Sequence, residues 1–499
     1  DGVNWVPGWG RNRIEGAVQS RPDWCISRQR SWGVPIPAFY DAQGEPILDA
    51  RIVRNTADLV QKHGSNVWFE RELTDLWAAV KPADWDGTEA VGKSTDTLDV
   101  WIDSGSSSRA VLMQRDELGR PGAEADTPDA WQADYYLEGS DQHRGWFQSS
   151  LLLSLAGNGV APYRNVLTHG FMVDADREKI SKSKQAGGYT KPQTAEAYIG
   201  NYGADIVRLW VASQDFRNDI IVSEERIKKV AEAYRGIRNA LRYQLSNLYD
   251  FDPAQHTVPD DELTGLDRWI LDVFAKLDAD VHAAFDKCEF HIAYQRITQF
   301  VAVELSAIYH DTVKDRLYTS PANSPRRRST QTALYRLVQG FAKMLSPMLV
   351  FTADEAWEAI PHLSAGSVHL ADWEPFEFGI SAEETANWET MFAIRERTLP
   401  VLEEARQAKR IGKSLEACVT LTGTGRELEI GQAHGEDLRE LINVSQLALE
   451  PGDGEGEELQ VAVTNADGEK CERCWRWEPT VGSHNDHATL CTRCVEAVS

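Results

Sequence analysis

Apolar residues recur at helical spacing through the middle of the chain. Over residues 227–248 they follow one another every three or four positions, which places them on one face of a long helix. The same period returns over residues 266–285, 290–313, 331–360 and 388–409. Pro347 interrupts one of these segments and is expected to kink or break it, because proline removes a helical hydrogen bond. The pattern predicts an all-α bundle of about five helices over residues 223–405.

The first 222 residues show a different pattern of apolar and polar positions. Short apolar or β-branched runs at residues 101–103, 135–137 and 165–167 alternate with helical patterns and with Gly and Pro. A helix is expected at residues 148–155, after the run at 135–137, which is the order of a βα unit. In such a unit the functional loop follows the carboxyl end of the strand. We therefore predict an α/β fold with candidate chemistry in the loop at residues 138–145.

Beyond Gly412 the helical period gives way to short strand-like runs at residues 417–421 and 459–463. The acidic, glycine-rich residues 450–458 between them are expected to form a flexible loop, because they cannot bury enough apolar surface to become ordered. We assign residues 406–467 to a linker with a small α+β junction. Residues 468–499 form a last small unit of their own.

Length and composition fit a globular protein. A hydrophobic content of 42% is enough to bury a sizeable core. The length of 499 residues suggests about three domains at roughly 150 residues each. Neither an apolar stretch of about 20 residues nor a secretory signal is found, so a cytoplasmic protein with no membrane contact is expected. Asp1 is not Met, so we expect the chain to begin partway through a longer protein.

The net charge of −25 argues against nucleic-acid binding through an overall positive field. Such binding would depend on local basic patches. The candidates are Arg326, Arg327 and Arg328, and the group Arg406, Lys409, Arg410 and Lys413. A short charged run is more often a solvated surface, so the patches gain meaning only if another feature implies a nucleic-acid partner.

Four of the seven cysteines lie close together near the carboxyl end. Cys471 and Cys474 form one CxxC pair, and Cys491 and Cys494 form a second pair after 16 intervening residues. This spacing is typical of a structural Zn²⁺ site, in which four thiolates close a tetrahedron and leave no position for water. Chance, two disulfides or a redox CxxC are the alternatives. We read His484 and His487 as surface residues, and assign no role to Cys25, Cys288 and Cys418.

A polar stretch near residue 180 carries two lysines three positions apart. Lys179-Ile180-Ser181-Lys182-Ser183 is followed by glycines, which is the composition of a mobile cationic loop. Such a loop can close over a polyphosphate and stabilise charge that develops in a transition state. Taken alone the signal is weak, because loops rich in Lys and Ser are usually solvated.

This motif resembles Lys-Met-Ser-Lys-Ser, the second signature of the class I aminoacyl-tRNA synthetases, with Ile180 in the Met position. Further segments resemble the isoleucine enzymes of this family, of bacterial type, in order and spacing. They are residues 21–33 (RPDWCISRQRSWG), 99–105 (DVWIDSG), 138–147 (EGSDQHRGWF), 202–210 (YGADIVRLW) and the tail that begins at residue 471 (CERCW). The resemblance covers essentially the whole chain.

Three alternatives explain less of the chain. Valine and leucine enzymes of the same family share the general plan, but look different at residues 138–147 and are not expected to end in this zinc unit. A non-catalytic zinc-ribbon tRNA-binding protein would explain residues 471–494 and none of the first 220 residues. A helical scaffold protein would explain the bundle alone.

The resemblance implies a multidomain protein. Residues 1–222 would be the carboxyl-terminal part of a Rossmann-like catalytic half, residues 223–405 an anticodon-binding helical domain, and residues 468–499 a zinc-binding tail. The reaction would activate isoleucine with ATP and Mg²⁺ to an adenylate, then transfer it to the terminal ribose of isoleucine tRNA. The family resemblance also implies a monomer.

The resemblance further implies roles for the loop at residues 138–145 and its neighbours. Glu138 would hold the amino group of the adenylate, since a carboxylate matches an ammonium in charge and hydrogen bonding. Gln142 would be a second polar contact. Trp101 and Trp146 would form apolar walls of the amino-acid pocket, although an aromatic residue such as Trp146 is more often part of a core.

With a tRNA partner implied, the basic patches become candidates for phosphate contacts. Such contacts position a nucleic acid without reading its sequence. The candidate residues are Arg326, Arg327, Arg328, Lys409 and Arg410. The bases that are read leave no local signature in a sequence.

Lys179 and Lys182 would stabilise the pyrophosphate leaving group, and Lys182 would be the principal ATP contact. The family usually has a glycine shortly before the first lysine, whereas this chain has Arg177 and Glu178 there. The change restricts the backbone of a loop that has to close.

Two parts of the family pattern are missing from the sequence. One is the editing insertion, which precedes residues 21–33 in the family; residues 1–13 resemble the strand that leaves it. The other is the first catalytic signature, a His-x-Gly-His loop that holds ATP. We therefore expect the chain to be truncated and catalytically inert alone.

Overall fold

The computed structural model describes residues 2–120, 127, 130–174, 194–363, 366–452 and 458–499. It divides into two compact units. The first unit comprises residues 1–179 and 216–221, and the second comprises residues 180–215 and 222–499. Each is described by itself below.

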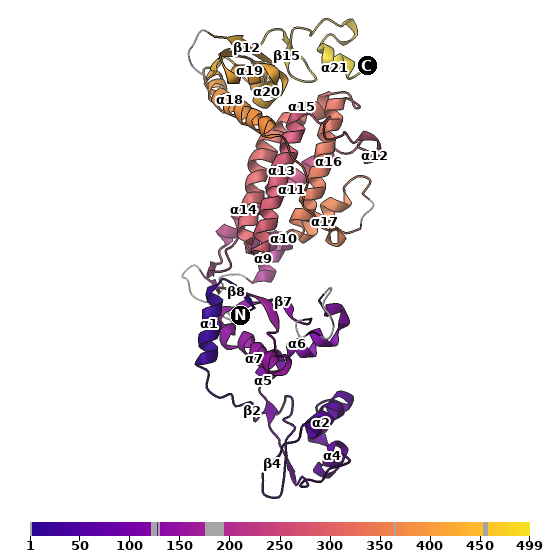
Figure 1. Ribbon diagram of the computed structural model, residues 1–499. Helices are drawn as coiled ribbons and strands as arrows, with labels where there is room; N and C mark the ends of the chain where they lie inside the picture. Colours follow the sequence, from indigo (N-terminus) through magenta and orange to yellow (C-terminus); the bar gives the residue numbers. More distant parts are fainter. Residues whose placement is uncertain (1, 121–126, 128–129, 175–193, 364–365, 453–457) are drawn as a thin grey trace. The chain divides into compact units, whose positions relative to one another are not determined.

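A parallel sheet of three strands forms the centre of the first unit, in the order β1 (Asn4–Val6), β8 (Tyr163–His169), β7 (Ala133–Gly139). Helix α7 (Trp146–Asn158) connects β7 to β8, so the three elements form a βαβ unit (Figure 1). Buried Tyr136, Phe147 and Val166 form its core with Ile14 of α1 (Trp9–Gln19). The predicted strands at 135–137 and 165–167 and the predicted helix at 148–155 are confirmed.

Two expectations for the first unit are wrong. The apolar run at 101–103 lies in a helix, α5 (Val100–Gly105), because Asp99 caps it by accepting a hydrogen bond from Trp101 N at 3.0 Å. The strand expected over residues 1–13 is limited to β1, since α1 begins at Trp9.

The remaining described elements of the first unit are short, except for the 14-residue helix α2. A small aromatic core of Phe39, Trp68 and Trp77 holds one group of them together, with ring centroids 5.0 Å apart for both Phe39–Trp68 and Phe39–Trp77. The helices are α2 (Ala50–His63), α3 (Val67–Glu70), α4 (Leu73–Val80) and α6 (Ser107–Ala110). The strands are β2 (Ser27–Arg28), β3 (Phe39–Tyr40), β4 (Pro46–Ile47), β5 (Gly92–Lys93), β6 (Thr97–Leu98), β9 (Met172–Val173) and β10 (Ile220–Ile221).

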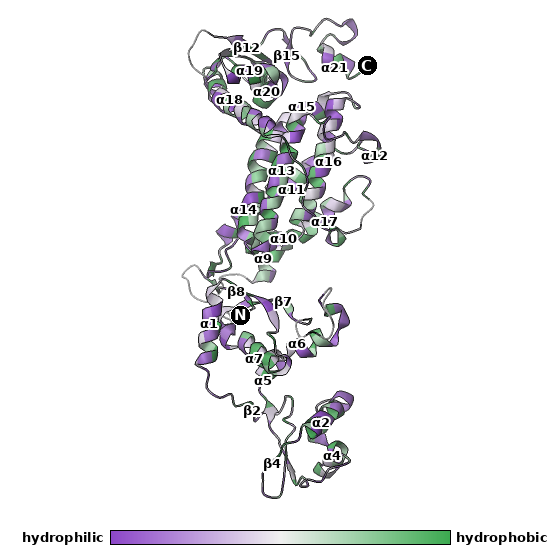
Figure 2. Ribbon diagram, viewed as in Figure 1, coloured by the Kyte–Doolittle hydropathy of each residue, from purple (hydrophilic) through white to green (hydrophobic). Residues whose placement is uncertain are grey.

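A helical bundle forms most of the second unit, and Figure 2 shows apolar faces along its helices. Its long helices are α11 (Glu224–Ser246), α13 (Gly265–Asp286), α14 (Phe290–Phe300), α16 (Pro325–Leu345) and α18 (Ala382–Gln407). The shorter ones are α9 (Ala195–Tyr202), α10 (Ala204–Ala212), α12 (Pro253–His256), α15 (Asp311–Thr319) and α17 (Val350–Glu358). A π-helical segment, Val301–His310, joins α14 to α15.

The five predicted helical segments are thus confirmed, and the break predicted at Pro347 lies between α16 and α17. Serine caps fix where three helices begin. The hydroxyls of Ser223, Ser324 and Ser381 accept hydrogen bonds from amides in the first turns of α11, α16 and α18. The Ser324 cap, followed by Pro325, starts α16 six residues before the apolar period that revealed it.

A small α+β region follows the bundle. Strand β11 (Ala417–Gly423) pairs in parallel with β12 (Gln446–Pro451) and antiparallel with β13 (Gln460–Asn465). Helices α19 (Arg426–Ala433) and α20 (Gly435–Ile442) connect β11 to β12. The runs at 417–421 and 459–463 are confirmed as strands, whereas β12, α19 and α20 were not predicted. The tail contains β14 (Glu469–Lys470), β15 (Trp477–Glu478) and α21 (Thr492–Glu496).

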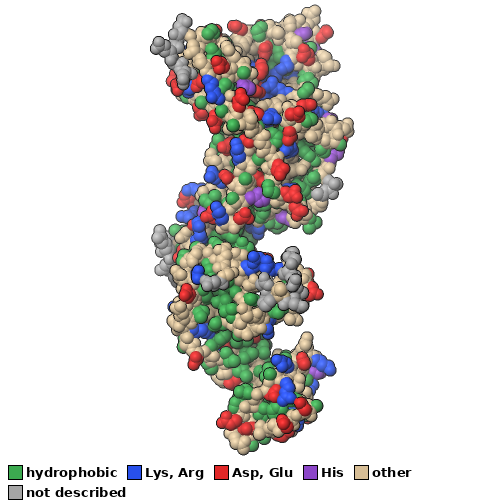
Figure 3. Space-filling model, viewed as in Figure 1, with side chains coloured by type: hydrophobic (Ala, Val, Ile, Leu, Met, Phe, Trp, Pro, Cys, Tyr) green, Lys and Arg blue, Asp and Glu red, His purple; other side chains and the backbone are tan. Residues whose placement is uncertain are grey.

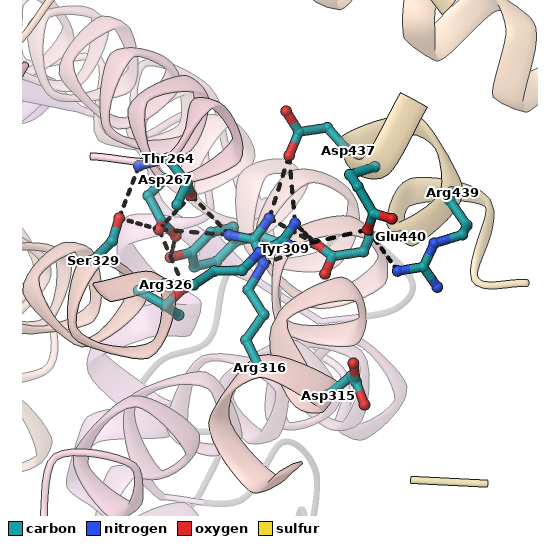
Figure 4. Close-up of polar contacts among 12 residues, drawn as sticks. Thr264, Asp267, Tyr309, Asp315, Arg316, Arg326, Ser329, Asp437, Arg439 and Glu440 are labelled. Carbon is teal, nitrogen blue, oxygen red and sulfur yellow. Dashed lines mark hydrogen bonds and ion pairs between the residues drawn. The ribbon is translucent and has the colours of Figure 1, made fainter. Parts of the chain in front are cut away.

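A buried ionic network joins the bundle to this α+β region (Figure 4). Arg316 of α15 has a side chain only 1% exposed and lies 2.7 Å from Glu440 of α20 and 3.6 Å from Asp267 of α13. Tyr309 donates a hydrogen bond of 2.6 Å to Asp267, and Arg316 donates one of 2.8 Å to the Thr264 hydroxyl. Three elements that are distant in sequence are thereby held around one guanidinium group.

His310 makes the stability of the bundle depend on pH. Its ring is 5% exposed, and its centroid lies 4.2 Å from that of Tyr243. Burial, assisted by the charge of Lys314, lowers the pKa of His310 to about 3. The unfolded chain therefore gains a proton near pH 6.5, whereas the folded chain stays neutral down to about pH 3. The contribution of neutral His310 to the free energy of unfolding is therefore fully present above pH 6.5. It decreases as the pH falls from 6.5 toward 3.

We expect acidification from pH 7 to pH 5 to lower the free energy of opening of residues 301–319 by about 2 kcal/mol through His310. Hydrogen exchange, corrected for intrinsic rates, measures this. The variant H310Q should lose this part of the pH dependence. H369Q, at an exposed position, serves as control and should behave like the unmodified chain. Identical pH profiles for H310Q and the unmodified chain would contradict the assignment.

Among the described residues, no helix is both long enough and apolar enough to cross a membrane.

Candidate active site and metal centre

Glu138 lies at the carboxyl end of β7. Its side chain is 51% exposed, and its Oε2 accepts a hydrogen bond of 2.9 Å from the backbone N of Gly139. His169 ends the neighbouring parallel strand β8, and its Nε2 lies 3.7 Å from Glu138 Oε2. In α/β folds ligands bind outside the carboxyl ends of parallel strands, which is where these two side chains meet. The arrangement offers an accessible carboxylate that can receive a cationic group.

Gln142 and Trp101 come together at Gly145. Gln142 lies in a 3-10 turn, Ser140–Arg144, where its Oε1 accepts a hydrogen bond of 3.0 Å from Trp146 N. A Cβ atom at Gly145 would lie 2.7 Å from that Oε1 and 3.0 Å from the Trp101 ring. Only glycine therefore allows both side chains to approach the start of α7. The structure thus gathers Trp101, Gln142 and the start of α7 within the first unit.

Trp146 is integrated into the core to a greater extent than Trp101. Its ring stacks on that of buried Tyr136 with 4.1 Å between centroids and 11° between planes. Its indole N–H donates a hydrogen bond of 2.9 Å to the carbonyl of Ser104. Trp101, in contrast, is 40% exposed. These contacts support the core alternative for Trp146, and the part of either ring in an amino-acid pocket stays a prediction.

His143 fixes the loop from inside and had no assigned role in the sequence. The residue is fully buried, with its Nδ1 3.0 Å from the Ser140 carbonyl and its ring 6.0 Å from Trp5 and 5.3 Å from Phe147. Burial lowers the pKa of His143, which favours the neutral form of the ring. It positions the loop that carries Gln142. No local pattern in the sequence distinguishes such a histidine from an exposed one.

Lys179 and Lys182, the lysines of the second signature, lie outside the described residues, which end at Asp174 and resume at Thr194. Arg177 and Glu178 lie outside them as well. The roles of these lysines therefore stay predictions.

The four clustered cysteines form a site that fits Zn²⁺. Cys471, Cys474, Cys491 and Cys494 are buried, and their Sγ atoms all lie within 4.8 Å of one another. The Sγ atoms of Cys474 and Cys491 are 3.8 Å apart. A tetrahedral zinc with Zn–S bonds of about 2.3 Å needs sulfurs about 3.8 Å apart. All seven cysteines are free, which excludes the disulfide alternative.

Neighbouring groups suit a cluster of thiolates. The backbone N of Cys491 donates to Cys471 Sγ at 3.4 Å, and Arg473 Nη1 lies 3.7 Å from Cys494 Sγ. Such outer contacts orient ligands and offset their charge. His484 lies outside the cluster, with its Nε2 3.1 Å from the hydroxyl of Thr492. Four protein ligands fill the tetrahedron, so the metal is structural.

Arginines that alternate with these cysteines attach the tail to the bundle within the second unit. Arg476 Nη2 lies 2.8 Å from Asp315 Oδ2, and Arg493 makes two hydrogen bonds of 2.6 and 3.0 Å to the same carboxylate. Arg473 donates to the carbonyl of Thr319, at the end of α15. Cations are favourable at a helix carboxyl terminus. The metal ligands thus fix the spacing of three arginines that contact one helix end.

The run of three arginines does not form the free basic patch that was expected. Arg327 and Arg328 are buried, because both pair with Asp250, at 2.7 and 3.3 Å. This interior position is incompatible with a phosphate contact in this conformation, so we correct the expectation for both residues. Arg326 is 34% exposed and pairs with Glu440 at 2.8 Å (Figure 4). Lys409 and Arg410, beyond the end of α18, are exposed.

Three family models match separate parts of the chain. Residues 1–223 match the family described as tRNA synthetases class I (I, L, M and V). Residues 267–421 match the anticodon-binding domain of tRNA ligases. Residues 468–497 match a zinc finger found in FPG and IleRS.

Individual relatives match along the whole chain. The isoleucine–tRNA ligase of Geobacter sulfurreducens is 46% identical over 507 residues, which covers 100% of this chain and 53% of the relative. Those of Syntrophotalea carbinolica and Halalkalibacterium halodurans are 45% and 44% identical, with the same two shares. The chain therefore spans about half the length of the curated relatives it matches. With the three domain matches and the cysteine cluster, the chain is similar from end to end to class I aminoacyl-tRNA synthetases, and in particular to isoleucine–tRNA ligases.

Proposed function

We propose that the whole protein is an isoleucine–tRNA ligase and that this chain is its carboxyl-terminal half. The protein activates isoleucine with ATP and Mg²⁺ to an enzyme-bound adenylate, then transfers the isoleucyl group to isoleucine tRNA. One observation carries the proposal: relatives named as isoleucine–tRNA ligases match the chain from end to end at about 45% identity. The position of the Glu138 carboxylate at the sheet edge supports it.

In the proposed site, Glu138 accepts the ammonium group of isoleucine and of its adenylate. Its exposed carboxylate at the sheet edge supports this role, because it is open to a cationic ligand. Trp101 supplies an apolar wall for the side chain, and Gln142 orients the start of α7 beside it. Lys179 and Lys182 stabilise the charge that grows on the leaving pyrophosphate. Mg²⁺ supplies further positive charge on the phosphates.

A pocket of this kind separates isoleucine from valine by one methylene. That difference amounts to on the order of 1–3 kcal/mol, a limit for which the isoleucine enzyme is itself the standard example. Accurate charging therefore requires editing, which we assign to a part of the whole protein beyond this chain.

Incomplete burial in the first unit supports a larger catalytic domain. Parallel sheets are normally covered on both faces. Here Tyr135 and Leu137, on one face of β7, are 50% and 57% exposed. Apolar side chains gather on the face of the first unit seen in Figure 3. A further segment that covers these side chains accounts for their exposure.

The bundle and the tail serve the tRNA partner in this proposal. The match of residues 267–421 to an anticodon-binding domain supports this part. Exposed Lys409 and Arg410 are proposed phosphate contacts, and Arg326 is a third that would have to leave Glu440. We propose that the protein acts as a monomer.

Exchange between pyrophosphate and ATP tests the activation step in the full-length protein. We expect exchange that depends on isoleucine and that falls at least tenfold, about 1.4 kcal/mol, in the K182A variant. K276A, in which an exposed lysine of α13 is removed, is the matched control and should retain the rate. An unchanged rate in K182A would remove its assigned role. Exchange that depends on valine or leucine alone would refute the isoleucine assignment.

A further inference from the structure

The first unit contains a hollow of about 390 Å³ whose arginines have no assigned role, although Trp101 of the proposed amino-acid site also lines it. Its lining includes Arg21, Arg28, Arg30, Arg144, Asp99 and Trp101. These residues come from three separate segments, which the fold of the first unit brings together. We call this hollow the arginine pocket.

Only one of the four guanidinium groups forms an ion pair with a residue that the structure describes. Arg28 forms an ion pair with Asp99, whose side chain is 6% exposed, and donates hydrogen bonds of 2.7 Å to the carbonyls of Cys25 and Ser27. Burial acts to raise the pKa of Asp99. Hydrogen bonds from the Trp101 amide and from Trp24, with the charge of Arg28, nonetheless hold it below its ordinary value. Asp99 is therefore an anion that offsets one positive charge.

The other three guanidinium groups form no ion pair among the described residues, although the charge of Arg21 also helps to lower the pKa of Asp99. Arg21 donates to the neutral amide of Gln148 and lies over the Trp24 ring, 4.7 Å from its centroid. Arg30 and Arg144 are exposed and make no hydrogen bond or ion pair with any residue that the structure describes. The pocket thus concentrates an excess of three positive charges in a chain whose net charge is −25. Converging cations in a concave site attract an anion and raise its local concentration.

The chemistry of the lining favours phosphate groups as the anion. A planar guanidinium donates two parallel hydrogen bonds to two oxygens of one phosphate. Aromatic rings accompany the arginines: Trp101 lines the pocket and is 40% exposed, and Trp32, two residues after Arg30, is 82% exposed. Arginines with exposed aromatic rings are typical of surfaces that bind single-stranded nucleic acid, since rings stack on bases while cations follow the backbone.

The position of the pocket identifies the part of the nucleic acid that reaches it. Trp101 and Gly145 line the arginine pocket, and both lie beside Gln142 at the proposed amino-acid site. An RNA that accepts the amino acid on its terminal ribose has to bring that end to the same place. The backbone just before the terminal ribose then falls next to the arginine pocket.

We propose that the arginine pocket binds phosphodiester groups of the unpaired 3′ end of the RNA substrate. The inference rests on the proposed function and adds to it a site that positions the acceptor end. Arg30 and Arg144 provide the cations that are free for the RNA. Arg21 and Arg28, held by Gln148 and Asp99, form the fixed floor of the pocket.

Binding of a labelled RNA hairpin to the purified 499-residue chain tests the proposal. One hairpin ends in four unpaired 3′ nucleotides, and a second has a blunt end. The test variant is R30A/R144A. The matched control is R54A/K62A, which removes the same charge from exposed positions of α2 outside the pocket.

We expect the test variant to bind the hairpin with the unpaired end about tenfold more weakly at low salt. Its salt dependence should fall by about 1.4 in logarithmic slope, since each phosphate contact to a single strand contributes about 0.7. The control should bind like the unmodified chain. Equal binding by both variants, or equal loss for blunt and unpaired ends, would overturn the proposal.

Competition separates RNA from free phosphate compounds. Unlabelled unpaired RNA should displace the labelled hairpin, whereas ATP and pyrophosphate at equal phosphate concentration should not. Displacement by ATP or pyrophosphate would assign the pocket to a nucleotide and overturn the proposal. The isoleucine-dependent exchange between pyrophosphate and ATP requires no RNA. If the proposed function is wrong, this exchange is absent. If only the role of the arginine pocket is wrong, the exchange is normal and the RNA-binding results differ from those expected.

Discussion

Exchange of Cys474 for serine is expected to abolish zinc binding and to unfold residues 468–499. The four cysteines are themselves the buried core of this tail, with only Val481 and Leu490 packed against them. So small a core cannot order the tail without a metal, and structural zinc contributes about 10–16 kcal/mol in isolated zinc fingers at neutral pH. Metal analysis should fall from about one zinc per chain to none, and amide protection in the tail should disappear.

The loss should extend into the bundle. Arg476 and Arg493 hold Asp315, and both lie within two residues of a cysteine ligand. Without the metal their spacing is no longer fixed, so the last turn of α15 should exchange faster as well. C418S, in β11, is the control and should keep both zinc and protection. A Cys474 variant that retains a full zinc, or a tail that stays protected without one, would contradict the metal assignment.

Exchange of Arg316 for alanine is expected to destabilise the second unit by about 3–5 kcal/mol. The guanidinium is 1% exposed and is the shared partner of Asp267, which is fully buried, and of Glu440, which is 4% exposed. Its removal leaves the fully buried Asp267 carboxylate without a cation, whereas Glu440 keeps its pair with Arg326. An uncompensated buried charge costs more free energy than the ion pair itself contributes. Hydrogen exchange of α13 and α15 measures the loss as a free energy of opening.

An exposed ion pair provides the matched control for this variant. Arg238 and Glu355 lie 2.7 Å apart, but their side chains are 48% and 65% exposed. R238A should cost less than about 1 kcal/mol, because solvent screens such a pair. Equal losses for R316A and R238A would contradict the view that burial of the Arg316 network holds α13, α15 and α20 together.

The helices of the second unit could be predicted because their signal is local and repeated. A period of three to four over more than twenty residues has few explanations other than a helix, and Pro347 breaks it wherever it packs. Short elements could not be predicted in this way, because they contain too few residues for a period to repeat. The apolar run at residues 101–103 resembles a strand, but the cap at Asp99 starts a helix there. Helices α19 and α20 have only 8 residues each, which is too short for a repeated helical period.

The candidate site divides in a similar way. The cysteine ligands could be read from spacing, because a CxxC pair brings two sulfurs to one ion through local geometry. The arginine run could not, since its partner Asp250 lies 77 residues before Arg327. Burial of His143 and the approach of Trp101 to Gly145 likewise depend on contacts between distant segments. Long-range packing decides whether a charged or aromatic residue is free to bind a ligand.

Charging of tRNA transcripts by the full-length protein tests the central claim most directly. Isoleucine, valine and leucine transcripts would each be offered with the matching labelled amino acid, ATP and Mg²⁺. We predict that isoleucine accumulates on the isoleucine transcript and that the other two transcripts stay uncharged. Charging of the valine or leucine transcript with its own amino acid, in preference to isoleucine, would contradict the proposed function.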